Sequence, residues 1–124
     1  MSELKTASVR IGKSRFNISS DDLYLKHFRT GARNQIANAI RRVAGTDTFE
    51  PGMTRLFAQL IRAEDICLDV GANIGCTGIL FAQLCRRVVA FEPTPKTFAL
   101  WQRNVDQSGL RNVEAHNFAL GRSA

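Results

Sequence analysis

The sequence predicts an α/β fold: the first βαβαβ half of a doubly wound parallel sheet, preceded by a β-hairpin and a helical lead-in. Short apolar runs at 66–70, 87–92 and 113–119 are typical of buried parallel strands. Stretches with helical spacing at 74–86 and 95–107 separate these runs, and Gly109 is placed to end the second helix. Strands that alternate with helices in this way indicate a parallel sheet.

The N-terminal part has a different pattern. Apolar residues alternate with polar ones on both sides of Gly12, which predicts a β-hairpin at about 7–18. Helical spacing of apolar residues then predicts a helical lead-in, and a further amphipathic helix over 53–62. We therefore divide the chain into a lead-in region, 1–49, and a partial α/β domain, 50–124.

The composition is that of an ordinary globular protein. Hydrophobic residues make up 44% and charged residues 23% of the 124 residues, which excludes a disordered chain. The net charge is +6, but no basic run exceeds two residues, so a nucleic-acid partner is disfavoured. No segment approaches the ~20 apolar residues of a membrane span, and the N-terminus lacks a secretory signal. We expect a cytoplasmic protein without a membrane partner. The three cysteines fit neither a disulfide framework nor a zinc site.

A glycine-rich turn joins the first predicted strand to the next helix. Ligands bind at this edge of parallel sheets, outside the carboxyl ends of the strands. Gly71 permits a tight turn, Gly75 permits close approach of a ligand or another segment, and helix N–H groups favour an anionic group. The dinucleotide pattern GxGxxG is broken at Asn73, and no lysine follows the glycines as a P-loop requires. The turn therefore indicates a nucleotide-type ligand of another kind.

Several segments together resemble one known family. The run DVGANIG is followed by AFEPTPKTF, RNVDQSGL and EAHNFALG, and the similarity extends over about 50–121. In this combination the chain resembles the FkbM family of S-adenosylmethionine-dependent methyltransferases. The resemblance implies a Rossmann-like class I methyltransferase fold, incomplete in this chain, with S-adenosylmethionine as cofactor.

The resemblance assigns the glycine-rich turn to the methionine part of the cofactor. The residues that would form this end of the site are Asp69, Gly71, Ala72, Asn73 and Gly75. From the residues alone, Asp69 is equally suited to cap the turn by accepting backbone hydrogen bonds.

The ends of the second and third predicted strands would hold the rest of the cofactor. Glu92 ends the second strand, where a carboxylate can accept hydrogen bonds from both ribose hydroxyls. The resemblance places Pro93 beside the adenine and Asn117 or Phe118 near the adenine amino group. Glu50 would also face the cofactor.

Other residues of the same region are expected to serve the fold. Gly78 lies inside the predicted helix and is assigned to helix packing. The helical spacing of Phe98, Trp101 and Val105 predicts a helix face that packs on the sheet. Asn104 is expected to make local hydrogen bonds near its helix end.

The resemblance implies methyl transfer to a hydroxyl oxygen of a small-molecule or glycan acceptor. The catalytic base is unknown, because His27 and His116 are lone histidines without a catalytic pattern. We expect a truncated chain that is inactive by itself and can self-associate through the unpaired edge of the first α/β strand. The alternatives are an inactive remnant or interaction module that has kept the fold, and a nicotinamide-dependent oxidoreductase.

Overall fold

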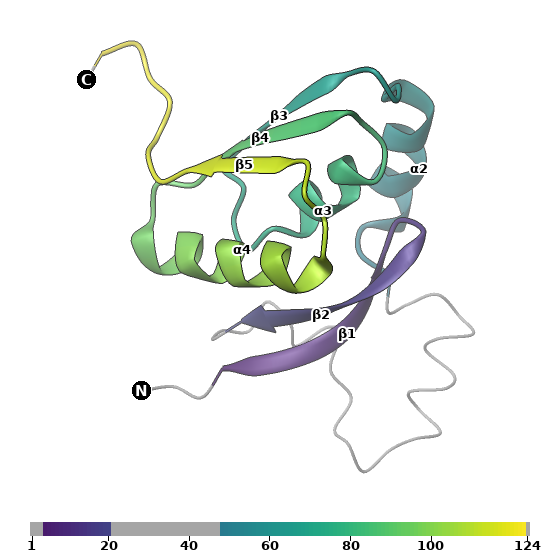
Figure 1. Cartoon of the computed structure of the whole chain (residues 1–124), viewed down its shortest axis with the longest axis horizontal. Helices are drawn as coiled ribbons and strands as arrows, with labels where there is room; N and C mark the ends of the chain where they lie inside the picture. Colours follow the sequence, from purple (N-terminus) through teal and green to yellow (C-terminus); the bar gives the residue numbers. More distant parts are fainter. Residues whose placement is uncertain (1–3, 21–47, 124) are drawn as a thin grey trace.

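The computed structural model describes residues 4–20 and 48–123, and it has the Rossmann-like architecture expected (Figure 1). A hairpin comes first, and a helix then precedes a βαβαβ unit. In chain order the elements are β1 (Lys5–Ile11), β2 (Ser14–Ser20), α2 (Pro51–Leu60), β3 (Ile66–Val70), α3 (Cys76–Ala82), β4 (Arg87–Phe91), α4 (Pro95–Ser108) and β5 (Val113–His116). The predicted helical lead-in and His27 lie outside the described residues.

The βαβαβ unit forms a parallel sheet with the strand order β3-β4-β5. Val89 of β4 lies opposite Leu68 of β3 and Glu114 of β5, so the carboxyl ends of the three strands meet at one edge. Helices α3 and α4 lie on the same face of this sheet, and the hairpin packs against α4 on its far side (Figure 1). The result is three layers: sheet, helices and hairpin.

The hairpin and the α/β part share a hydrophobic core. Gly12 has φ +60° at the turn, a conformation that glycine adopts without strain. The alternation predicted from the sequence buries Val9 and Ile18 completely, and they join a cluster that includes Ile79 and Trp101. The described part of the lead-in region is therefore packed on the α/β domain rather than separate from it.

Asn104 of α4 connects the hairpin to the glycine-rich turn. Its Oδ1 accepts a hydrogen bond from Ser19 N at 2.7 Å, and its Nδ2 donates to Ser19 O at 3.0 Å and to Ile74 O at 2.8 Å. The local role expected for this residue is wrong, because its partners lie 85 and 30 residues away. Asn104 is fully buried, so these bonds satisfy polar groups that water cannot reach.

Two elements are shorter than their sequence patterns predict. Helix α3 begins at Cys76 because Gly75, with φ +103°, cannot continue a right-handed helix backwards. It ends at Ala82, and the next side chain, Gln83, donates to Ile11 O of the hairpin at 2.9 Å. Strand β5 ends at His116. Helix α4 ends as predicted, with Gly109 at φ +73°.

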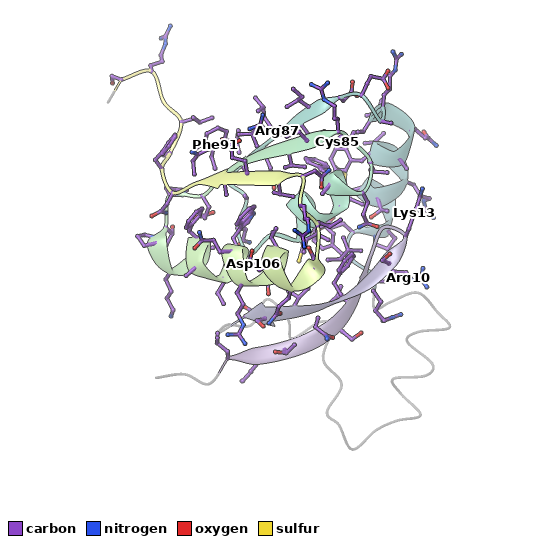
Figure 2. All side chains as sticks on the ribbon, in the orientation of Figure 1. Arg10, Lys13, Cys85, Arg87, Phe91 and Asp106 are labelled. Atoms are coloured by element: carbon purple, nitrogen blue, oxygen red, sulfur yellow. The ribbon has the colours of Figure 1, made fainter. Side chains whose placement is uncertain are left out.

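The face of the sheet turned away from the helices carries exposed apolar side chains. On β3, Leu68 and Val70 are each 62% exposed, and Ile66 is 51% exposed. Within the described residues β3 pairs only with β4, so its other edge is unpaired. Phe91 and Arg87 lie on this face, whereas Asp106 lies on α4 (Figure 2). Among the described helices, none is long and apolar enough to cross a membrane.

Candidate functional site

The glycine-rich turn folds over the carboxyl end of β4. The N–H groups of Gly71 and Ala72 both donate to Phe91 O, at 2.9 and 3.0 Å. Gly71 has φ +77°, and a side chain on it would meet nothing within 4 Å, so its outer side is open. Asn73 also has a left-handed conformation, with φ +52°. No other part of the described structure covers the turn at Gly71, so a ligand has access to it there.

Glu92 ties the glycine-rich turn to the loop after β4. Its Oε2 accepts a hydrogen bond from Asn73 N at 3.0 Å, and its Oε1 accepts one from Thr94 N at 2.9 Å. Only 8% of the residue is exposed. Charge-assisted hydrogen bonds of this kind are stronger than neutral ones, so Glu92 fixes the relative position of the two loops.

The loop after β5 joins the same cluster. Asn117 Nδ2 donates to Glu92 O at 2.8 Å and to Pro93 O at 3.1 Å, and Glu92 N donates to His116 O. The two bonds of the Asn117 side chain hold the residue after β5 against the loop that follows β4, and β5 ends at His116. Phe118 is 50% exposed and lies against the ring of Phe91, with ring centroids 5.6 Å apart.

Asp69 is the second carboxylate of the site, and it is buried. It is 7% exposed, and its Oδ2 has no hydrogen-bond partner among the described residues. Burial, followed by the nearby charge of Glu92, raises the pKa of Asp69 to about 6. Asp69 Oδ2 therefore does not cap the turn by accepting a backbone hydrogen bond. A cationic ligand group beside it would stabilise the charged form of the carboxylate.

The charges and hydrogen bonds of the site disfavour a phosphate. The N–H groups of Gly71, Ala72 and Asn73, which could have faced an anion, all donate within the protein. Two carboxylates, Asp69 and Glu92, lie close enough for one to raise the pKa of the other. The three N–H groups of the turn are thus used within the protein and the local charge is negative, so a phosphate at the turn itself is disfavoured.

Gly75 is approached closely by α4. A side chain on Gly75 would meet Trp101 Cδ1 and Val105 Cγ2 at 3.4 Å, and one on Gly78 would lie 3.7 Å from Trp101 Nε1. Of the two approaches predicted for Gly75, the structure shows the approach of another segment. The sequence pattern placed Trp101 on a packed helix face. Only the fold shows that this face packs against the glycine-rich turn.

Glu50 lies in the segment before α2, and the side chain of His116 lies on the outer face of the sheet, although its carbonyl accepts from Glu92 N. Glu50 precedes α2, and its neighbour Phe49 donates a backbone hydrogen bond to Arg10 O of β1. Helix α2 lies beside the amino end of β3, whereas the site lies at the carboxyl ends (Figure 1). His116 Nε2 lies 2.9 Å from Glu114 Oε1, and its ring stacks on Phe91.

Possible metal ligands and the thiol of Cys76 complete the inventory of reactive groups in this region. Within residues 4–20 and 48–123, no three His, Cys, Asp or Glu side chains gather as metal ligands. The thiol pKa of Cys76, next to the turn, is raised to about 12 by burial, so this cysteine is not an activated nucleophile.

Comparisons with known proteins agree with this fold. No family model matches the chain. "Methyltransferase 1" of Beauveria bassiana is 35% identical over 65 residues, which cover 48% of this chain and 24% of that protein. An rRNA methylase from Streptococcus thermophilus superimposes with a TM-score of 0.52 at 19% identity, over 55% of this chain and 41% of that one. The chain has the Rossmann-like fold of these methyltransferases.

A structure with a bound ligand gives the same fold. A Streptococcus mutans protein, solved in complex with SAH, superimposes with a TM-score of 0.51 at 16% identity, over 54% of this chain and 38% of that one. The chain thus spans about a quarter of the curated relative's length and about two fifths of the length of these two solved chains.

Proposed function

We propose that this chain is the cofactor-binding part of an S-adenosylmethionine-dependent methyltransferase. The observation that carries the proposal is the pair of buried carboxylates, Asp69 and Glu92, beside an open glycine-rich turn at the carboxyl ends of the strands. A dinucleotide would bring two phosphates to this negative site. S-adenosylmethionine has no phosphate. Its methionine part carries a cationic ammonium group beside a carboxylate, and its ribose has two free hydroxyls.

The residues present fit this cofactor. Each oxygen of Glu92 accepts one backbone hydrogen bond, and a carboxylate oxygen has a second lone pair for a ribose hydroxyl. The Oδ2 of Asp69 is a buried acceptor that lacks a partner among the described residues, and its negative charge matches the ammonium group. The open side of Gly71 gives room for the methionine part. Pro93, Asn117 and Phe118 would then border the adenine.

The finer assignment to the FkbM type rests on the sequence segments that resemble this family. It makes the acceptor a hydroxyl of a small molecule or a glycan. The cofactor supplies the methyl group, and the protein's main contribution is to hold the reactants in attack geometry, an effect that can be worth ~7–11 kcal/mol. The side chain of His116 does not serve the turn, because it is bonded to Glu114 on the outer face of the sheet. The second candidate is therefore a cofactor-binding module without catalysis.

Calorimetric titration of the purified chain with S-adenosylhomocysteine tests the proposal. Glu92→Gln keeps the side-chain shape but removes the charge and replaces one acceptor by a donor. The expected result is saturable binding that weakens at least tenfold in this variant, since tenfold corresponds to about 1.4 kcal/mol and one hydrogen bond to a charged group contributes about 1.5–3 kcal/mol. Glu114→Gln is the matched control, because Glu114 lies on the outer face and should not affect affinity.

The outcomes separate the candidates. Binding that is lost in Glu92→Gln and retained in Glu114→Gln supports the proposed site. A folded wild-type chain that binds NAD but not S-adenosylhomocysteine contradicts the proposed function and favours the nicotinamide-dependent oxidoreductase. A chain that binds S-adenosylhomocysteine and transfers no methyl group to any hydroxyl acceptor offered supports the module without catalysis. Circular dichroism of each variant shows whether the fold is intact.

A further inference from the structure

Two buried polar atoms near the proposed site lack partners in the part of the chain that the structure describes. They are Oδ2 of Asp69, which can only accept a hydrogen bond when ionised, and Nε1 of Trp101, which can only donate one. The two residues are 7% and 4% exposed. A buried donor or acceptor without a partner is rare, because its desolvation is not compensated. These two atoms are chemically complementary.

Both atoms face the same small space beside Gly78. A Cβ built on Gly78 would lie 3.5 Å from Asp69 Oδ2 and 3.7 Å from Trp101 Nε1. The same nitrogen lies 3.7 Å from the position of a Cβ on Gly75. The indole of α4 therefore lies beside both glycines, and its nitrogen borders the same space as the carboxylate of Asp69, the next-to-last residue of β3. A bulkier residue at position 78 would fill the space between them.

The orientation of the indole is fixed by its neighbours. The ring stacks on Phe98, one turn earlier in α4, with centroids 5.9 Å apart and an interplanar angle of 3°. Val105, one turn later, closes the other side of Gly75. A ring held in this way loses little further conformational entropy when its N–H makes a hydrogen bond. The N–H is therefore available for one particular partner.

We propose that Trp101 is a positioning residue for Asp69, with its indole N–H linked to the Asp69 carboxylate through one bridging water in the space beside Gly78. This goes beyond the residues assigned to the cofactor, and its effect on the cofactor depends on the proposed function. The link would satisfy both buried atoms and hold the carboxylate at the carboxyl end of β3. A donor on α4 would thus connect the helix layer to the ligand side of the sheet.

The link also affects the charge of Asp69. Burial and the charge of Glu92 raise the pKa of the Asp69 carboxyl, which disfavours the anion that a cationic ligand group needs. A water that accepts from the indole N–H and donates to the carboxylate opposes both effects, because hydrogen bonds to the charged form stabilise it. Trp101 would therefore keep Asp69 ionised near neutral pH without adding a positive charge that repels the ligand.

The chain has a single tryptophan, so the link can be observed without any ligand. In protein labelled with ¹⁵N-tryptophan, the indole N–H gives one signal, which we expect to shift with pH as Asp69 ionises. Asp69→Asn should abolish this shift. Asp106→Asn, which changes an exposed carboxylate on the same helix, should leave it unchanged. An indole signal that does not move with pH, while the Asp69 carboxyl signal does, overturns the proposed link.

The effect on the ligand is tested with Trp101→Phe, which keeps an aromatic ring and removes the N–H. The expected result is that S-adenosylhomocysteine affinity falls and that the pH midpoint of binding rises by about one unit, a tenfold change in the ionisation equilibrium. Phe98→Leu is the matched control, since it alters the packing of the ring but keeps its N–H. Loss of affinity with an unchanged midpoint, or equal effects in both variants, overturns the positioning role. If the wild type does not bind, the proposed function fails, and the indole signal still decides the link.

Discussion

Replacing Asp69 by Asn should stabilise the protein at neutral pH. The pKa of Asp69 is raised from 3.8 to about 6 in the folded chain by burial and by the charge of Glu92. Between these values the native state holds a proton that the unfolded chain has released, so the free energy of unfolding falls as the pH rises. Above pH 6 the folded protein bears the full free-energy cost of an ionised, buried Asp69. Asparagine is neutral at every pH, so the variant does not bear this cost.

The magnitude follows from the shift. Two pKa units correspond to about 3 kcal/mol at 1.36 kcal/mol per unit. This is an upper limit, because a water-mediated link from Trp101 to the ionised carboxylate would reduce the penalty. Asp69→Asn should therefore be more stable than the wild type by up to about 3 kcal/mol at pH 7, and the difference should shrink toward zero by about pH 4.

Urea unfolding of both proteins at a series of pH values measures this difference. The same variant should bind S-adenosylhomocysteine more weakly at pH 7, since it lacks the charge that the ammonium group would meet. Stability and binding would then change in opposite directions, as at many functional sites. A stability difference that is the same at pH 4 and pH 7, or an Asp69→Asn protein less stable than the wild type at pH 7, would refute the reasoning.

Three further predictions concern other parts of the fold. Asn104→Ala should lower the free energy of unfolding by about 3 kcal/mol or more, because it leaves buried backbone groups of Ser19 and Ile74 without partners. Urea unfolding at pH 7 measures this change, and an unchanged free energy would contradict the role of Asn104 in joining the hairpin to the turn. Gly78→Ala fits at ordinary contact distances and gains roughly 0.5–1 kcal/mol of helix propensity. It also fills the space between Asp69 and Trp101, so it should weaken S-adenosylhomocysteine binding in a calorimetric titration; unchanged affinity would contradict a role for that space. Leu68→Lys should reduce self-association through the β3 edge, measured by sedimentation; a wild type that remains monomeric at all concentrations would end this prediction.

Much of the fold could be predicted because its signals are local. The three parallel strands begin where the apolar runs begin, and the hairpin turns at Gly12. Helix α4 starts at Pro95 and ends before Gly109, as proline and glycine usually mark helix ends. The early end of β5 and the hydrogen bonds of the Asn117 side chain to the carbonyls of Glu92 and Pro93 were not predictable, because they depend on how separate loops pack.

The candidate site was predicted in part. The turn at 69–75 and the carboxylate of Glu92 could be located from spacing alone, since a parallel sheet brings the carboxyl ends of its strands to one edge. The backbone partners of Glu92 could not be predicted, nor the use of the turn's N–H groups within the protein. Both depend on how three loops pack together. Glu50, assigned by resemblance, precedes α2, a helix that lies beside the amino end of β3 (Figure 1).

The sequence by itself determined the order of strands and helices and the two carboxylates beside a glycine-rich turn. These follow from apolar periodicity and from residues with special backbone freedom, which act within a few positions of the chain. Only the tertiary structure decided that Asn104 binds a strand 85 residues away and that Trp101 lies beside Asp69. Such contacts arise when separate layers pack and leave polar atoms without water, and no local pattern records which atoms will then meet.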